Sequence, residues 1–216
     1  MDTENKILLF GGTFNPIHNG HLIMAQEAVE RLDFNEVIFI PSATPPHKED
    51  AVGAYHRVKM TKLGIEDVDY FKISDVEEKR EGPSYTYDTV QYFREKYPES
   101  LIYWMIGTDT IPELKTWYKI EDLVNECKFL IAERNPYKYY AGKNEKLFDF
   151  IEEHTKTFIK DGVTNHFVPL VNSILEISST DIRKRVKNCE YQTIRFFIPD
   201  QVEQYIYDNN LYRLKS

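Results

Sequence analysis

Residues 11–21 read GGTFNPIHNGH, and this stretch, which we call the glycine loop, indicates the fold. It follows an apolar run at residues 7–10 and precedes a helical pattern that begins near Leu22. Two glycines directly after a strand let the backbone turn sharply and leave room for a bound group. The helix that follows directs free N–H groups and a partial positive charge at the same space. This order of elements is typical of a phosphate-binding loop.

Two histidines, His18 and His21, lie three residues apart in the glycine loop. Imidazoles can donate hydrogen bonds to phosphate oxygens, or carry positive charge when protonated. A single glycine turn or a single histidine is more often structural, and a histidine pair can also bind a metal. No cysteine or carboxylate nearby completes a metal-ligand set. The strand, glycines, histidines and helix start together favour phosphate binding.

The composition is that of an ordinary globular chain of 216 residues, with 42% hydrophobic and 29% charged residues. A net charge of -8 argues against a nucleic-acid surface. The two cysteines, Cys127 and Cys189, form no zinc or disulfide pattern and fit a reducing cytoplasm. The polar start of the chain and the short apolar runs predict neither a signal peptide nor a membrane span. We therefore expect a cytoplasmic protein that binds small molecules, with no nucleic-acid or membrane partner.

Apolar runs that alternate with helical patterns predict a parallel sheet. Strands are expected at residues 6–10, 37–40, 70–74, 101–106, 128–132 and 167–170. Helices are expected at residues 22–32, 55–65, from Ser84 or Thr86 to about Tyr97, in short pieces within 110–125, near 147–151, from about 180, and from Pro199 as a first helical residue. Residues 77–83 are expected to form a loop. The pattern predicts one α/β domain, residues 1–216, with a doubly wound sheet of five or six parallel strands and a C-terminal helical part at residues 178–216.

Polar candidates follow the ends of three expected strands. Lys48 lies in the proline-rich loop after residues 37–40, Asp109 follows 101–106, and Arg134 follows 128–132. Ligands of doubly wound sheets bind outside the carboxyl ends of the strands. We therefore expect these residues to converge with the glycine loop, although Lys48 alone is equally explained as a solvated surface lysine.

A second stretch, ISSTDIR at residues 177–183, repeats the pattern of a helix start. The hydroxyls of Ser178 and Ser179 and the free N–H groups of the cap can bind phosphate, and Arg183 supplies a planar cation. An ordinary N-cap with a solvated arginine would give the same local pattern. In a chain that already contains the glycine loop, the stretch favours a second phosphate contact.

The candidate residues supply hydrogen-bond donors rather than a nucleophile. The chain lacks a nucleophile elbow, a Walker P-loop and the G-x-G-x-x-G fingerprint. Donors suit nucleotidyl transfer, in which an ionised substrate phosphate attacks the α-phosphorus of a nucleoside triphosphate and pyrophosphate leaves. Alignment and charge stabilisation then carry catalysis. Mg²⁺ bound to the triphosphate would need no carboxylate cage of its own.

Six motifs, spread in order over nearly the whole chain, resemble the bacterial nicotinate-nucleotide adenylyltransferase family of the H-x-G-H nucleotidyltransferase superfamily. They are GGTFxPIHxGH at 11–21, PPHK at 45–48, SYT at 84–86, IGxD at 106–109, LxxW at 114–117 and ISSTxxR at 177–183. The resemblance implies a Rossmann-like nucleotidyltransferase fold. It also implies transfer of adenylyl from ATP, with Mg²⁺, to nicotinate mononucleotide. The products would be nicotinate adenine dinucleotide and pyrophosphate, in NAD biosynthesis.

The resemblance also implies roles for individual residues. Those implied to bind ATP are Gly11, Gly12, Thr13, Phe14, His18, His21, Gly107, Asp109, Ser178, Ser179 and Arg183. Those implied to bind the mononucleotide are Tyr85, Thr86, Trp117, Tyr118 and Arg134. Trp117 would stack on the pyridine ring, and backbone groups of Thr86 and Tyr118 would read its carboxylate; a core tryptophan is the alternative for Trp117. The candidate catalytic residues are His18, His21, Lys48 and Arg183.

Asn15 departs from the family, which usually carries aspartate at this position; the amide can bond to the loop backbone but has no charge. Three other functions stay open: phosphopantetheine adenylyl transfer, ATP or dinucleotide sensing without catalysis, and an aminoacyl-tRNA synthetase of the same loop type. The sequence matches the first mainly in the glycine loop, and it shows no tRNA-binding module. The preference for the acid or amide mononucleotide and the oligomeric state are also open. The tyrosines within 137–140 could serve a homo-oligomer contact or a loop lid.

Overall fold

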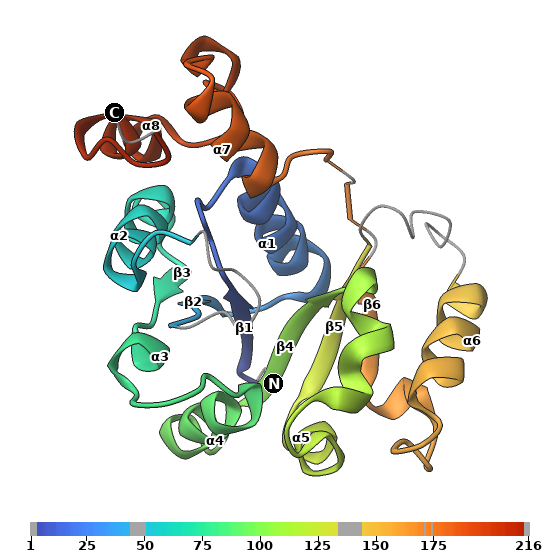
Figure 1. The fold of residues 1–216 in the computed structure, drawn as a ribbon. Coiled ribbons are helices and arrows are strands. Elements are labelled where there is room, and N and C mark those ends of the chain that lie inside the picture. The colour runs from blue at the N-terminus through green and yellow to red at the C-terminus, as the bar shows by residue number, and fades with distance from the viewer. Residues whose placement is uncertain (1–3, 44–50, 134–143, 171, 174, 214–216) are drawn as a thin grey trace. The chain divides into compact units, whose positions relative to one another are not determined.

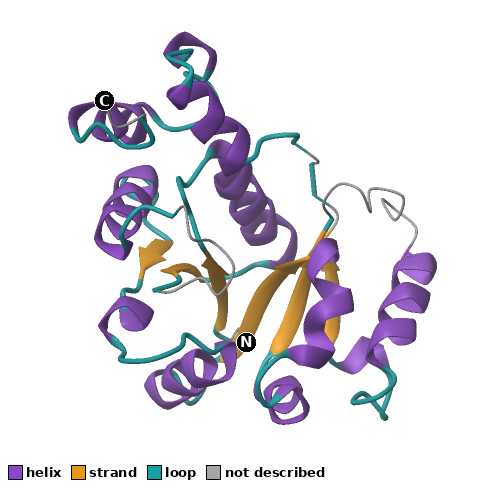
Figure 2. Cartoon of the chain, viewed as in Figure 1, coloured by secondary structure: helices purple, strands orange, loops and turns teal. Residues whose placement is uncertain are grey.

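The computed structural model describes residues 4–43, 51–133, 144–170, 172–173 and 175–213, and it contains a six-stranded sheet (Figures 1 and 2). The strands are parallel and run in the order β3-β2-β1-β4-β5-β6. Their bounds are β1 Lys6–Gly12, β2 Glu36–Pro41, β3 Phe71–Ile73, β4 Leu101–Gly107, β5 Lys128–Ala132 and β6 Phe167–Leu170. The predicted doubly wound parallel sheet is therefore confirmed.

Helices alternate with these strands along the chain, as the sequence predicts. The α-helices are α1 Asn19–Leu32, α2 Ala54–Ile65, α3 Val76–Lys79, α4 Thr86–Lys96, α5 Ile120–Glu126, α6 Asn144–Thr155, α7 Ser179–Lys187 and α8 Asp200–Asp208. The 3₁₀-helical segments are η1 Thr108–Thr116, η3 Val163–Asn165 and η4 Tyr191–Thr193. Among the described residues, no helix is long and apolar enough to cross a bilayer.

Internal contacts divide the chain into two compact units. Unit 1 consists of Met1–Gly11, Gln26–Val37 and Tyr85–Ile174. Unit 2 consists of Gly12–Ala25, Ile38–Ser84 and Leu175–Ser216.

Unit 1 contains the paired strands β1, β4, β5 and β6. Lys6 is in register with Leu101, and β4 continues until Gly107 lies opposite Ala132 at the ends of β4 and β5. Residues 102–106 of β4 and 129–132 of β5 are buried on both faces, which explains their continuous apolar runs. The segments that follow Gly107 and Ala132 therefore begin side by side at the carboxyl ends of β4 and β5.

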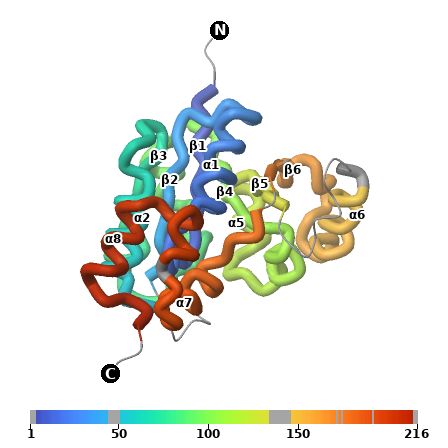
Figure 3. Tube along the Cα trace, turned by 90° about the horizontal axis from the view of Figure 1, so that it is seen from above, coloured from blue at the N-terminus to red at the C-terminus, as the bar shows by residue number. Residues whose placement is uncertain are grey.

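Unit 2 contains the pair of helices α2 and α8, which lie side by side (Figures 1 and 3). Gly64 of α2 permits this packing, because a Cβ there would lie 3.0 Å from Ile17 and 3.5 Å from Val202. A hydrogen bond of 2.9 Å between His56 Nδ1 and the Tyr205 hydroxyl also joins the two helices. The C-terminal helices are thus part of the packed core of unit 2.

One predicted loop is partly helical. Residues 77–83 were expected to be irregular, but α3 begins before them at Val76. Ser74 Oγ accepts a hydrogen bond of 3.3 Å from the Val76 N–H, and Asp75 forms an ion pair of 2.9 Å with Lys79 one turn later. These local contacts favour a single helical turn that hydrophobic periodicity could not reveal.

Two predicted helix starts are also wrong in detail. Neither Ser84 nor Thr86 caps α4; the N-cap is Tyr85, which makes no side-chain cap hydrogen bond. Pro199 is the N-cap of α8 rather than its first residue. Its carbonyl oxygen accepts hydrogen bonds of 3.0 Å from the N–H groups of Val202 and Glu203.

Candidate active site

The part of the glycine loop that lies in unit 2, residues 12–21, is held by its carbonyl groups. Arg57 Nη1 donates to the Thr13 oxygen over 3.0 Å. Ser42 donates to the Gly12 oxygen through its N–H, over 2.9 Å, and through its hydroxyl, over 3.2 Å. Because these oxygens are bonded to protein donors, they present little negative charge to an incoming anion. The loop is therefore suited to phosphate.

The buried side chain of Phe14 packs against other residues of the glycine loop. Its ring is buried and packs edge-on against the His21 imidazole, with ring centroids 5.1 Å apart. The position of the ring explains Gly12, since a Cβ there would lie 2.9 Å from the Phe14 ring. With its side chain enclosed, Phe14 could contact ATP only through its backbone.

His18 and His21 form a stacked pair. Their ring centroids are 3.6 Å apart and their planes differ by 20°. The His18 N–H donates a hydrogen bond of 3.2 Å to His21 Nδ1, so in neutral His21 the ring proton is on Nε2. Nε2–H is then the group that can donate to a phosphate oxygen.

The first turn of α1, which lies between and includes part of the histidine pair, requires a glycine. A Cβ on Gly20 would lie 3.1 Å from His18 Nδ1 and 3.6 Å from the Cβ of Ile177. Gly20 thus lets the buried His18 ring lie against the first turn of α1, close to the start of the second motif. Sequence spacing alone could not show that residues 20 and 177 are neighbours.

The second motif is bonded to the glycine loop. Ser178 is the N-cap of α7, and its hydroxyl accepts a hydrogen bond of 3.1 Å from the Asp181 N–H, as the sequence predicts. Ser179 Oγ donates to the Pro16 carbonyl over 2.8 Å, and Arg183 Nη1 donates to the Asn15 carbonyl over 2.9 Å. The second motif is therefore bonded directly to the glycine loop within unit 2, a contact that was not among the predictions from the sequence.

Unit 1 holds the predicted ribose and pyridine contacts. Gly107 ends β4, and Asp109 lies in the first turn of η1. Trp117 is the C-cap of η1, half-buried, with its ring 6.3 Å from that of Phe129 in an edge-on arrangement. Trp117 is thus neither a core tryptophan nor fully exposed, and its free surface can stack on a ring.

Aromatic rings from the start of α4 lie against Tyr118, the residue that follows Trp117. The Tyr85 and Tyr118 rings lie 4.5 Å apart. Lys119 has the left-handed φ of 52°, and its ammonium lies 4.6 Å from the centre of the Tyr87 ring and 5.3 Å from that of Tyr118. Tyr85, Thr86 and Tyr118 are predicted from the sequence, whereas Tyr87 and Lys119 lie in no motif and were not predicted.

Two predicted site residues, Lys48 and Arg134, lie outside the described residues, as do the tyrosines of 137–140. Their roles stay predictions.

Comparisons with known proteins agree with this geometry. The model of the cytidylyltransferase-like family matches residues 9–185. A probable nicotinate-nucleotide adenylyltransferase from Clostridium botulinum (strain Loch Maree / Type A3) is 43% identical over 211 residues, covering 97% of this chain and 99% of the relative. The nicotinate-nucleotide adenylyltransferase of Bacillus subtilis (strain 168) is 38% identical, covering 96% and 98%. The chain belongs to the nicotinate-nucleotide adenylyltransferase family.

Solved structures support the fold of this family member. Nicotinic acid mononucleotide adenylyltransferase of Plasmodium falciparum, complexed with NaAD, aligns with a TM-score of 0.73 at 23% identity, covering 97% of this chain and 98% of that one. A putative nicotinate-nucleotide adenylyltransferase from Vibrio parahaemolyticus aligns with a TM-score of 0.64 at 20% identity, covering 98% and 97%. The Rossmann-like nucleotidyltransferase fold is therefore confirmed.

Arg57 supports the site of this family member, and this role was not predicted from the sequence. Only 1% exposed, it donates to the carbonyls of Val52, Thr13, Ser42 and Ala43. Burial lowers the pKa of its guanidinium, while the negative charges of Glu78 and Glu77 act in the opposite direction. Its sequence position inside a helical pattern gave no sign of this role, because most helical arginines are solvated.

Glu133 is a second missed residue, one position beyond β5 in unit 1. Its backbone is held at two points by Asn172, which accepts from the Glu133 N–H over 2.8 Å and donates to the Glu133 carbonyl over 3.2 Å. The carboxyl is buried, and among the described residues its Oε2 has no hydrogen-bond partner. Burial raises the pKa of this carboxyl above its ordinary value.

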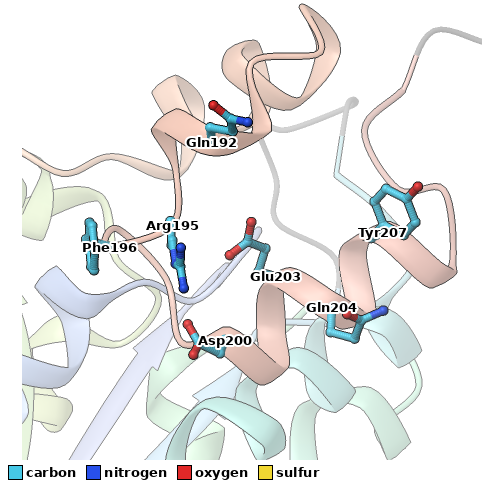
Figure 4. Close-up of a pocket in the computed structure, with 7 residues that line it drawn as sticks. All are labelled: Gln192, Arg195, Phe196, Asp200, Glu203, Gln204 and Tyr207. Atoms are coloured by element: carbon cyan, nitrogen blue, oxygen red, sulfur yellow. The ribbon is translucent and has the colours of Figure 1, made fainter.

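A wide hollow of about 780 Å³ lies elsewhere in unit 2 of this family member (Figure 4). It is lined by Gln192, Arg195, Phe196, Asp200, Glu203, Gln204 and Tyr207. None of the predicted site residues lines it. Its charges are mixed, so it offers no field of one sign that would select a charged ligand. It borders the glycine loop at one point, where Asn19 Nδ2 donates a hydrogen bond of 2.8 Å to the carbonyl of the lining residue Phe196.

Proposed function

We propose that the protein transfers the adenylyl group of ATP to nicotinate mononucleotide, forming nicotinate adenine dinucleotide and pyrophosphate in NAD biosynthesis. The observation that carries this proposal is the bonding of the two phosphate motifs to each other in unit 2. Ser179 and Arg183 of α7 hold the carbonyls of Pro16 and Asn15, beside a stacked histidine pair. These bonds use the Ser179 hydroxyl proton within the protein, and they fix the N–H groups of the loop and of the first turn of α7 beside the histidines. Such fixed donors suit a reaction that needs charge stabilisation rather than a protein nucleophile.

In this reaction a phosphate oxygen of the mononucleotide forms a bond to the α-phosphorus of ATP. The bond from the α-phosphorus to the bridging oxygen of pyrophosphate breaks. His21 would donate Nε2–H to the transferring phosphoryl or its neighbour, and the N–H groups of the glycine loop and of the first turn of α7 would bind the phosphates. The attacking oxygen is already ionised, so no protein base is required.

Mg²⁺ would enter as part of the ATP complex. The described residues contain no group of three or more His, Cys, Asp or Glu side chains that could hold a metal ion. A magnesium ion carried by the triphosphate and its waters would neutralise phosphate charge without such a group. Asp109 and Gly107 would meet a ribose, and Lys48 would add a phosphate contact.

The mononucleotide would lie against Trp117, whose free surface can stack on an electron-poor pyridine ring. Backbone groups of Thr86 and Tyr118, with Tyr85 and Arg134 nearby, would read its carboxylate. A cytoplasmic location is supported by the two cysteines, both free thiols, one buried and one exposed. A homo-oligomer remains a prediction to be tested by light scattering, with the tyrosines within 137–140 replaced.

The test is pyrophosphate release from ATP and Mg²⁺ by the purified protein, with nicotinate mononucleotide, nicotinamide mononucleotide and phosphopantetheine compared in parallel. We expect release with the nicotinate form and a strong preference for it over the amide. Release with phosphopantetheine alone would show that phosphopantetheine, and not nicotinate mononucleotide, is the acceptor substrate. ATP binding without release in any arm would make the protein a nucleotide sensor and overturn the proposal.

A further inference from the structure

The segment after α8 turns back toward the glycine loop of unit 2. The N–H groups of Asn209 and Leu211 donate to the carbonyls of Tyr205 and Ile206, over 3.1 and 3.0 Å, so the chain leaves the helix in a bonded turn. Leu211 is buried, and Tyr212 has a φ of 64°. A tyrosine adopts this left-handed conformation only where its surroundings fix it. The turn therefore points to a defined place for the Tyr212 side chain.

That place is beside Asn15 of the glycine loop. The Tyr212 hydroxyl donates a hydrogen bond of 2.8 Å to Asn15 Oδ1, and it lies 3.9 Å from Met60 Sδ. Burial raises the pKa of the Tyr212 phenol above its ordinary value, although the charges of Arg183 and Arg57 act against this shift. The phenol therefore stays protonated and remains a donor at neutral pH.

Asn15 links Tyr212 to the second motif. It is only 3% exposed, and its side chain also accepts from the Val52 N–H over 3.4 Å. Its backbone carbonyl accepts from Arg183, and the carbonyl of the next residue, Pro16, accepts from Ser179. A shift of Asn15 would therefore move the acceptors that hold both residues of the second motif.

We propose that Tyr212 is a positioning residue for adenylyl transfer, which acts by fixing Asn15 and through it the glycine loop. This inference rests on the proposed function. Tyr212 touches no substrate in this role; it sets where the loop N–H groups and the histidine pair stand when charge develops on the phosphoryl group. Small displacements of such groups reduce turnover more than they reduce substrate binding.

The matched pair of variants is Tyr212→Phe and Tyr205→Phe. Each removes one hydroxyl, and the Tyr205 hydroxyl makes a bond of similar length, 2.9 Å, to His56 Nδ1 rather than to a residue of the glycine loop. We expect Tyr212→Phe to lower kcat about tenfold with the KM for ATP changed less than about twofold. Tyr205→Phe should leave kcat unchanged. Equal kcat values for Tyr212→Phe and the wild type would overturn the proposal.

Asn15 supplies the second half of the test. Asn15→Asp keeps an acceptor oxygen for Tyr212 and is expected to retain turnover, whereas Asn15→Ala should lose it. In the double variant Asn15→Ala/Tyr212→Phe the two losses should not multiply, because both break the same bond. Fully multiplicative losses would show that Tyr212 acts independently of Asn15, which contradicts the proposal.

Amide hydrogen exchange separates this inference from the proposed function. Exchange in peptides that cover residues 11–21 should be faster in Tyr212→Phe than in Tyr205→Phe, whatever the substrate is. If the wild type released no pyrophosphate but the two variants still differed in exchange, the proposed reaction would be wrong and the role of Tyr212 in fixing the loop would be supported. Unchanged exchange in an active enzyme would reject the positioning role alone.

Discussion

The hydroxyl of Ser179 donates a hydrogen bond of 2.8 Å to the carbonyl oxygen of Pro16, a residue 163 positions earlier in the chain. This bond fixes the start of α7 against the glycine loop. It gives the two motifs one shared geometry, so that a phosphate chain bound by one would be bound by the other.

Ser179→Ala is expected to weaken ATP binding about tenfold, because the loop loses a donor and the Pro16 carbonyl is left unsatisfied. Titration calorimetry with ATP measures the effect. Thr193→Ala is the control, since the Thr193 hydroxyl makes a bond of 2.7 Å to the Glu190 carbonyl away from the motifs. Equal losses in both variants would mean that the Ser179 bond only stabilises the fold.

His21→Ala should lower kcat by about two to three orders of magnitude, because it removes the donor aimed at the transferring phosphoryl. His21→Gln keeps a donor and should recover part of the rate. His18→Ala should cause a similar loss, since it removes the ring that stacks on His21 and orients it. Circular dichroism checks the fold. Near-normal turnover in any alanine variant would remove that histidine from the mechanism.

Trp117→Ala is expected to raise the KM for nicotinate mononucleotide about tenfold while the KM for ATP stays unchanged, since stacking on the pyridine ring is lost. Trp117→Phe should keep much of the affinity. Steady-state kinetics with each substrate varied in turn decide the matter. A rise in the KM for ATP alone would place the adenine, not the pyridine, at Trp117.

Glu133→Gln should raise the melting temperature at pH 7. The raised pKa of Glu133 means that the folded state favours the protonated carboxyl. The carboxyl therefore makes its full contribution to folding stability below the ordinary glutamate pKa of about 4.3, and this contribution is lost as the pH rises through the pKa of the folded state. The gain from the substitution should therefore vanish near pH 4. Thermal scans across this range measure it, with the exposed Glu99→Gln as control. A gain that did not change with pH would have another cause.

Local sequence was enough for the strands and for the cap of α7. Runs such as residues 101–106 are apolar because β4 is buried on both faces, and the Ser178 hydroxyl bonds within its own turn. The strand order β3-β2-β1-β4-β5-β6 depends on pairings between distant segments and was not predicted. The single turn α3 was missed because it is made by Ser74 and Asp75 contacts rather than by hydrophobic spacing.

The motifs marked the residues of the candidate site but not their supports. His18, His21, Ser179 and Arg183 stand in recognisable spacings, so the sequence could name them. Arg57 is a helical arginine in sequence and a buried clamp on loop carbonyls in the structure. No spacing rule connects residue 57 to residue 13, since that contact exists only after the chain has folded.

The bond between Asn15 and Tyr212 joins residues that are 197 positions apart. During translation the ribosome therefore releases the glycine loop long before the tyrosine that holds it. A nascent chain, or a fragment cut before residue 212, carries every motif residue and yet lacks this bond. Full turnover then becomes a property that the enzyme acquires late in its synthesis, and a protease that trims the segment after α8 would slow the enzyme without touching a single substrate contact.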